Sequence, residues 1–162
     1  MIYEIKDTNK ISPLFGHWEE TLIWSCLQGI MGKIYANDLT APTAAMAVIG
    51  DFTFFAGEPC PELIAYRPPH CTQNFMIAVP QNKLWENMLT QFYGKKAKII
   101  SRYATKKEPP IFNKHHLEKI VASLPKQYTL SMIDSHFYKL CKSEAWSKDL
   151  VSQFSTYEKY RR

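Results

Sequence analysis

Two apolar runs joined by Gly50-Asp51 constrain the fold more than any other feature of the sequence. The runs are AAMAVI over residues 44–49 and FTFFAG over residues 52–57. A Gly-Asp pair between such runs is typical of a tight hairpin turn, because glycine tolerates the left-handed backbone that such a turn needs. The sequence therefore predicts an antiparallel hairpin in the first half of the chain.

Helical signals precede this hairpin. Ser12-Pro13 is typical of a helix start, since a proline in the first turn needs no amide partner. An apolar stripe with helical spacing follows at Ile23, Leu27, Ile30 and Ile34. This spacing predicts one amphipathic helix that extends through residues 17–35.

Beyond the hairpin, extended and helical segments alternate with short connections. Strands are predicted at residues 74–79, 95–107 and 128–133, and the proline-rich residues 58–70 predict an irregular surface loop. Helices are predicted at residues 83–93, 115–124, 136–142 and 146–154. The first three of these helices follow the capping residues Asn82, Asn113 and Asp134.

Positive charge is concentrated in one region. Residues 1–94 carry five basic and nine acidic side chains, whereas residues 95–126 carry nine basic and two acidic ones. On the predicted strand 95–107, one face would present Lys96, Lys98, Arg102 and Lys106. Clustered cations can neutralise the phosphates of a nucleic acid. We favour the more common meaning, a solvated strand face that guards a sheet edge.

Several classes of site have no motif in this sequence. No two of the six glycines are separated by a single residue, so the dinucleotide-binding GxGxxG fingerprint is absent, as are GK[ST], GxSxG and HExxH. The four cysteines, Cys26, Cys60, Cys71 and Cys141, are far apart and are expected to be free thiols. Cys60, His70 and Cys71 lack the usual ligand spacings, so we predict no metal site.

The sequence also has no signal for a membrane or for secretion. No apolar run approaches the roughly 20 residues that a spanning helix needs. The first ten residues, MIYEIKDTNK, lack the basic and then apolar order of a secretory signal. We therefore expect a cytoplasmic protein.

Longer stretches carry a family resemblance. They are GHWEETLIWSCLQGIMGKIYAND (16–38), GDFTFFAGEP (50–59), VPQNKLWENML (79–89), RYATKKEP (102–109), VASLPKQYTLSMID (121–134) and EAWSKDLVSQFSTYEKY (144–160). The chain resembles the amino-terminal region of a bacterial subfamily of two-part GNAT-type acetyltransferases. The resemblance covers nearly the whole chain and is most specific at residues 18–29 and 146–154.

The resemblance implies an α+β (α/β mixed) fold, a GNAT-like half with a central, mostly antiparallel sheet flanked by helices. Residues 1–125 would form this amino-terminal domain, and residues 126–162 would be the first strand and two helices of a catalytic GNAT domain, truncated at Arg162. The intact family member would transfer an acetyl group from acetyl-CoA to a primary amine. Backbone amides would polarise the thioester while the amine attacks it.

The same resemblance bears on the cofactor and on the site residues. GNAT enzymes hold the CoA pyrophosphate on backbone amides in a Gln/Arg-x-x-Gly-x-Gly/Ala loop, which needs glycine for close approach. The junction that we compare with it, residues 79–84, has no glycine, and Pro80 has no amide donor. We therefore expect no acetyl-CoA binding by this chain. No catalytic residue is identifiable, and Trp146 and Asp149 are the candidates for an acceptor-site loop; otherwise they are a packed tryptophan and a first-turn helix residue.

Two functions follow as expectations. The first is the amino-terminal portion of an N-acetyltransferase, inactive alone, whose partner is a carboxyl-terminal catalytic half. The apolar side chains of residues 127–162 would then lack their normal partners, so this segment should fold back on the first domain or pair with a second copy, and we favour the homodimer. The alternative function is a non-enzymatic interaction module that uses the basic strand 95–107 to bind nucleic acid or an acidic partner.

Overall fold

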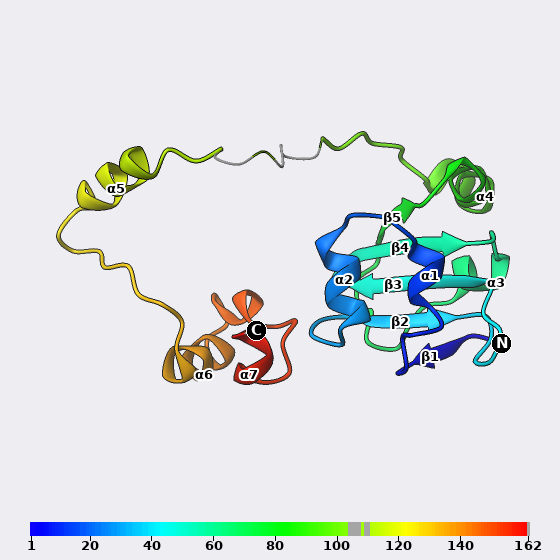
Figure 1. The fold of residues 1–162 in the computed structure, drawn as a ribbon, viewed down its shortest axis with the longest axis horizontal. Coiled ribbons are helices and arrows are strands. Elements are labelled where there is room, and N and C mark those ends of the chain that lie inside the picture. Colours follow the sequence, from blue (N-terminus) through cyan, green and yellow to red (C-terminus); the bar gives the residue numbers. More distant parts are fainter. Residues whose placement is uncertain (104–107, 109–110, 162) are drawn as a thin grey trace.

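The computed structural model describes residues 1–103, 108 and 111–161 (Figure 1). In its first part the elements are β1 (Tyr3–Ile5), α1 (Ser12–Phe15), α2 (Thr21–Leu27), β2 (Lys33–Ala36), β3 (Ala44–Ile49), β4 (Phe52–Gly57), α3 (Pro61–Ala65), β5 (Ile77–Pro80), α4 (Lys83–Tyr93) and the short 3-10 helix η1 (Gly94–Lys96). The rest of the described chain contains α5 (Lys114–Ala122), α6 (Ser135–Ser143), the 3-10 helix η2 (Lys148–Leu150) and α7 (Tyr157–Tyr160).

The strands form one mixed sheet in the order β1-β2-β3-β4-β5. Neighbours are antiparallel from β1 to β4, and β5 then runs parallel to β4. The hairpin predicted at Gly50-Asp51 is confirmed, because Ile49 pairs with Phe52 and Gly50 has a φ of 54°. The predicted α+β class with a mostly antiparallel sheet is confirmed as well.

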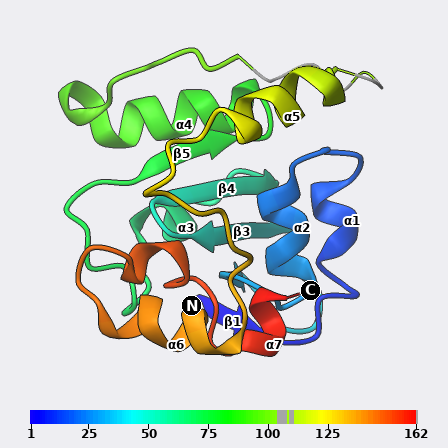
Figure 2. The same ribbon diagram turned by 90° about the vertical axis from the view of Figure 1, so that its left-hand side faces the viewer.

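Helices cover both faces of the sheet (Figure 2). On one face, Phe15 of α1 and Ile23 of α2 pack against β2, β3 and β4. On the other face, Leu63 of α3 and Trp85 of α4 pack against the same three strands. The strand β3 is therefore buried on both sides, which explains why it reads as a continuous apolar run. Each large side chain buried in these two clusters contributes about 1.5–3 kcal/mol.

The predicted helix at residues 17–35 is wrong in length. The helix α2 ends at Leu27, and Gly29 and Gly32 follow with positive φ. At Gly32 the chain passes so close to the helix that a Cβ would lie 2.6 Å from the sulfur of Cys26. Ile34, which has helical spacing in the sequence, is instead part of strand β2. Neither β1 nor β2 was predicted as a strand.

Around residues 79–84, where β5 leads into α4, the predictions are closer to the structure. Helix α4 spans residues 83–93 as predicted, with the Asn82 carboxamide accepting hydrogen bonds from the amides of Leu84 and Trp85. The strand predicted at residues 74–79 is the shorter β5, which is half-buried because it lies at the edge of the sheet. The predicted loop 58–70 contains the short helix α3.

In the last third of the chain the helices are better predicted than the strands. The caps Asn113 and Asp134 and the helices α5 and α6 are confirmed. Residues 95–103 and 128–133 contain no strand, so both strand predictions are wrong there, and residues 104–107 lie outside the described part of the chain. The helix predicted at 146–154 is reduced to η2. Alternation alone does not make a strand, since a strand also needs a neighbour to pair with.

Residues 135–161 contact the first part of the chain at Gly29, just after helix α2. The helices α6 and α7 and the turn η2 form a small unit around Tyr138 and Val151, both of which are buried. The ammonium of Lys159 donates to the carbonyl of Gly29 at 2.8 Å. This hydrogen bond leaves most large apolar side chains of residues 127–161 exposed, among them Leu130, Trp146 and Leu150, so it does not give the burial that the expected fold-back required. Pairing with a second copy stays a prediction.

Candidate functional site

Two strand-to-helix junctions lie next to each other in the sheet. Strand β4 ends at Gly57 and leads into α3, and strand β5 ends at Pro80 and leads into α4. Because β4 and β5 are parallel neighbours, their carboxyl ends meet at the same edge, which is where ligands bind in many sheets of this type. Sequence reasoning pointed only to the junction of β5 with α4.

The side chain of Gln81 links these two junctions. Its backbone amide donates to the carbonyl of Phe55 at 3.0 Å, which continues the pairing of β4 with β5. Its Oε1 accepts a hydrogen bond from the amide of Gly57 at 3.0 Å, and its Nε2 donates to the carbonyl of Leu14 at 2.8 Å. One carboxamide thus joins β4, β5 and helix α1.

Trp85 completes the contacts of Gly57. Its indole is fully buried, and the Nε1–H donates to the carbonyl of Gly57 at 2.9 Å. The ring also packs against Phe55, with 5.1 Å between the ring centroids. Both backbone groups at the end of β4 are therefore bonded to side chains that follow β5.

These contacts bear on whether the junctions suit acetyl-CoA. A pyrophosphate site needs free backbone amides at the junction. Here the amide of Gly57 is already bonded to Gln81, and Pro59, Pro61 and Pro80 have no amide hydrogen. The amides of Leu63 and Ile64 in the first turn of α3 both bond to the carbonyl of Cys60. The residues of these two junctions do not fit the CoA pyrophosphate.

The acceptor-loop candidates Trp146 and Asp149 lie near each other at the carboxyl-terminal unit. Trp146 is 83% exposed, so the alternative of a packed tryptophan does not hold. Asp149 lies in the first turn of η2 and is exposed. No interaction between the two defines a site, and their role stays a prediction.

The basic segment is arranged differently from its prediction. Lys95 and Lys96 belong to η1, and the following residues are extended but unpaired. The guanidinium of Arg102 lies over the ring of Phe52, 5.2 Å from its centroid, so this cation packs on the protein's own sheet. The described part of the segment therefore does not present its cations on one strand face.

A buried tyrosine and a histidine form a contact that sequence reasoning missed. The hydroxyl of Tyr35 lies 3.3 Å from Nδ1 of His70, and the two rings stack with centroids 6.2 Å apart. Burial raises the pKa of Tyr35, with a smaller contribution from Glu4. Burial, and then the positive charge of Lys33, lower the pKa of His70, while Glu4 acts in the opposite direction. The contact joins residues 35 positions apart, so no local pattern signals it.

The cysteines match their prediction. All four are free, and Cys26 is buried between α2 and the sheet. Burial raises the pKa of Cys26 to about 12. Within residues 1–103, 108 and 111–161, no group of three His, Cys, Asp or Glu side chains could hold a metal ion. In the same ranges, no helix combines the length and apolar character that crossing a bilayer requires.

The order of elements defines the class of protein. An antiparallel meander of β1 to β4 is followed by helix α3, the parallel edge strand β5 and helix α4, which agrees with the mostly antiparallel sheet flanked by helices that the sequence resemblance implied. The sequence model of the GNAT acetyltransferase family matches residues 12–162, and the chain belongs to this family.

A solved structure is similar over nearly the whole chain. It is the crystal structure of a GCN5-related N-acetyltransferase-like protein from Streptococcus suis 89/1591, with a TM-score of 0.75 and 37% sequence identity. The match covers 96% of this chain and 61% of that chain, so this chain spans less than two thirds of the relative's length. No curated protein matches the chain.

Proposed function

We propose that this chain is the amino-terminal half of an acetyl-CoA-dependent N-acetyltransferase that acts on a primary amine. In this proposal the chain neither binds acetyl-CoA nor transfers acetyl groups by itself. Its function is to pack against a catalytic half and to form one wall of the acceptor pocket, where Trp146 and Asp149 are the candidates for contact with the amine.

The observation that carries the proposal is the closed junction at Gly57. Family membership favours acetyl transfer, but the backbone groups at the end of β4 are bonded to Gln81 and Trp85. The side chains of the domain itself occupy the backbone groups that would have to bind the cofactor. Such a domain is better suited to packing against a catalytic half than to binding acetyl-CoA.

Exposed apolar side chains support the proposal that the chain packs against a partner half. Helix α5 stands apart from the sheet in Figure 1. Its apolar stripe consists of Leu117, Ile120 and Val121, and with Leu124 just beyond the helix these side chains are 38–52% exposed. Further large apolar side chains are exposed on either side of α5, at Ile111, Phe112, Leu130 and Met132. Exposed apolar side chains in such number are typical of a protein interface.

Two measurements test the proposal. Calorimetric titration of acetyl-CoA into the chain should give no saturable heat, and a micromolar dissociation constant, equivalent to about 8 kcal/mol, would contradict it. Acetyl transfer to a panel of primary amines should be undetectable for the chain alone. It should appear when the chain is mixed with the part of the Streptococcus suis relative that this chain does not match.

A matched pair of variants tests the interface. Ile120→Glu places a charge in the exposed stripe of α5, whereas His115→Glu places the same charge on the opposite side of that helix. We expect Ile120→Glu to abolish binding of the catalytic half in a pull-down assay and His115→Glu to preserve it. Equal binding by both variants would show that α5 is not the interface.

The interaction-module alternative loses its main support. It depended on a strand at residues 95–107 with its cations on one face, and residues 95–103 form no strand. Fluorescence anisotropy with a DNA duplex probe at physiological ionic strength should show only weak binding of the duplex to this chain. Tight binding that falls steeply with salt and disappears in Lys96→Glu/Arg102→Glu would favour the module instead.

A further inference from the structure

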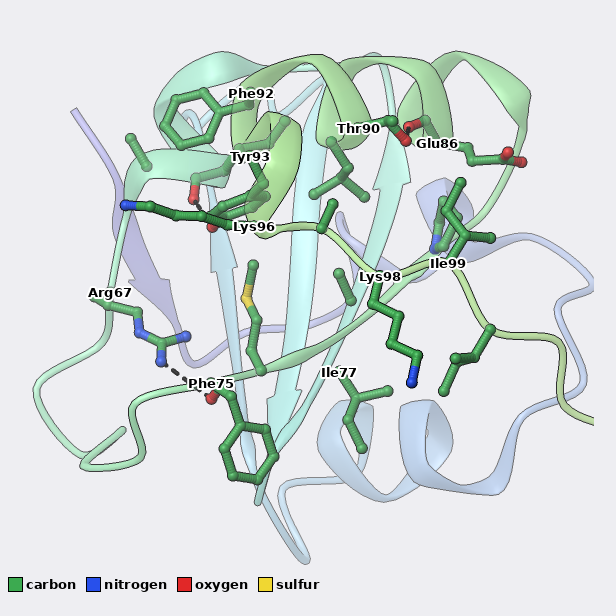
Figure 3. A pocket seen from close by; sticks show the side chains of 18 of the residues that line it. Arg67, Phe75, Ile77, Glu86, Thr90, Phe92, Tyr93, Lys96, Lys98 and Ile99 are labelled. Atoms are coloured by element: carbon green, nitrogen blue, oxygen red, sulfur yellow. Dashed lines mark hydrogen bonds between the residues drawn. The ribbon is translucent and has the colours of Figure 1, made fainter.

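A groove of about 930 Å³ runs along the outer side of the edge strand β5 (Figure 3). Its walls are β5 with the residues just before it, α4, the end of α3 with Arg67, and residues 96–101. A volume of this size lies within the range of small-molecule sites. The groove is distinct from the Gly57 junction, because neither Gly57 nor Gln81 lines it.

The walls of the groove are mainly apolar. They are contributed by Phe75, Ile77, Leu89, Phe92, Ile99 and Ile100. Several of these side chains are exposed in the chain as it stands, and Ile99 is 70% exposed. An apolar ligand body that covers them would remove this surface from water, which is favourable by about 25 cal/mol per Å².

The charges of the groove are mostly positive. The charged residues that line it are Arg67, Lys96, Lys98 and Glu86. The carboxylate of Glu86 forms an ion pair with the ammonium of Lys83 at 2.6 Å, so a neighbouring cation offsets its charge. Three cations therefore face the groove against one paired acid.

Arg67 is held in place at one end of the groove. Its Nη2 donates to the carbonyls of Gln73 and Phe75 at 2.7 and 3.1 Å. These acceptors are neutral, so the guanidinium keeps its charge while its position is fixed. In Figure 3 the side chain of Lys96 extends toward the same end, whereas Glu86 and Ile99 lie at the other end. Two cations, Arg67 and Lys96, therefore lie toward one end of the groove, whereas Lys98 lies beside Ile77 along its mainly apolar length.

We infer that this groove binds an amphipathic monoanion, a single acidic head group on an apolar chain, such as a long-chain carboxylate. The head group would lie between Arg67 and Lys96, where a fixed guanidinium offers a charge-assisted hydrogen bond. The chain would lie along Ile77 and Ile99 beneath α4. This inference does not depend on the proposed acetyl-transfer function.

The test uses dodecanoate as the probe and dodecyltrimethylammonium as its cationic control. Calorimetric titration should give saturable, one-to-one binding of dodecanoate and much weaker binding of the cation. In ¹⁵N-correlated spectra, the amides that shift should belong to β5, α4 and residues 96–101. The inference is wrong if there is no saturable heat up to about 1 mM, if both probes bind equally, or if the shifts are confined to the exposed stripe of α5.

Two matched pairs of variants locate the binding. Arg67→Gln/Lys96→Gln should weaken dodecanoate binding at least about tenfold, whereas Lys6→Gln/Lys10→Gln, which removes the same charge near the opposite edge of the sheet, should not. Because Arg67 also holds its own loop, a second pair uses exposed residues only. Ile99→Asp should weaken binding, and Ile111→Asp, outside the groove, should leave it unchanged. Equal effects within either pair would overturn the inference.

The anionic head groups and acyl chains of a membrane surface have the same chemistry as a free amphiphile. A vesicle-binding experiment distinguishes these two ligands. The groove is a concave site with α4 as one wall, whereas a membrane surface is flat, and this shape favours a free amphiphile. We expect no cosedimentation with phosphatidylglycerol vesicles at physiological ionic strength. Binding to these vesicles without binding to dodecanoate would contradict the inference.

Discussion

The carboxamide of Gln81 accepts a hydrogen bond from the backbone amide of Gly57 at 3.0 Å, and this bond joins the ends of two parallel strands. Parallel strands in an open sheet often separate at such a point to admit a ligand. In this chain the same carboxamide also donates to the carbonyl of Leu14, so the strand ends are held together and to helix α1. The junction is therefore a structural connection.

Replacing Gln81 tests how much this connection stabilises the fold. Gln81→Leu removes the acceptor for Gly57 and the donor for Leu14, so we expect the free energy of unfolding to fall by about 2–3 kcal/mol. Urea denaturation measures this change. Gln91→Leu, on the exposed side of α4, is the matched control and should change stability by less than about 0.5 kcal/mol. Equal midpoints for the two variants would contradict the structural role of Gln81.

Trp85 makes the complementary bond to the carbonyl of Gly57. Trp85→Phe keeps an aromatic ring in the core but leaves that carbonyl without its indole partner, so we expect a loss of about 2–4 kcal/mol from the missing bond and the reduced volume. Trp24→Phe makes the same change on α2, where the side chain is 44% exposed, and should cost less than about 1 kcal/mol. Thermal unfolding of both variants measures these losses. A larger loss for Trp24→Phe than for Trp85→Phe would contradict the structural role of the Trp85 hydrogen bond.

Gly57 itself is required by its backbone and by its surroundings. It has a φ of 78°, and a Cβ at this position would collide with the carbonyl oxygen of Thr43. Gly29 has a similar φ of 65°, but no atom lies within 4 Å of its Cβ position. We expect Gly29→Ala to cost about 1 kcal/mol from the backbone alone and Gly57→Ala to cost at least about 3 kcal/mol. Chemical denaturation gives both values, and equal losses would mean that the collision is relieved.

The contrast between local and distant interactions explains which parts of the fold follow from the sequence. Asn82, Asn113 and Asp134 were identified as caps because a cap bonds amides two or three residues away. The Gly50-Asp51 turn is equally local. Strand β2 was missed because its partners β1 and β3 decide its conformation, and Ile34 has the spacing of a helical residue.

The candidate site was harder to predict for the same reason. Gln81 bonds to residues 24 and 67 positions away, and neither contact leaves a pattern in the sequence. Residues 95–103 alternate like a strand, yet alternation does not supply the neighbouring strand that would fix them. The family resemblance identified the correct family, whereas the groove beside β5 depends on how α4 and residues 96–101 meet in space.

Partial desolvation of His70, an exposed residue in contact with Tyr35, makes stability depend weakly on pH. The pKa of His70 in the folded protein is lower than its usual value of 6.5, because burial and Lys33 disfavour the imidazolium. The unfolded chain therefore binds the proton more readily, so stability is fully present above pH 6.5 and declines as the pH falls through that value. NMR titration of the imidazole should give a pKa below 6.5.

The salt bridge between Lys33 and Glu4 provides a matched pair of variants for this titration. Lys33→Gln removes a positive charge near the ring and leaves Glu4 unpaired, so both effects should raise the pKa of His70. Glu4→Gln removes the negative charge and should lower that pKa. Shifts in the same direction for the two variants would contradict the electrostatic origin of the effect.

The thiol of Cys26 should be chemically protected in the folded chain. Its burial raises its pKa to about 12, and the sulfur lies against the carbonyl of Val48 inside the core. Cys60, Cys71 and Cys141 are partly exposed. At pH 8 a disulfide reagent such as Ellman's reagent should therefore react quickly with three thiols, and with the fourth only after unfolding in urea.

Replacing Cys26 identifies the protected thiol. In Cys26→Ala the quickly reacting thiols should still number three in the folded chain, and unfolding should expose no further one. Cys71→Ala is the control, and it should reduce the quickly reacting thiols from three to two while one thiol stays protected. The rate of the protected thiol should follow the opening of the core between α2 and β3, because the reagent cannot reach the sulfur otherwise. Four thiols reacting at one rate in the folded protein would mean that α2 does not cover the sheet as described.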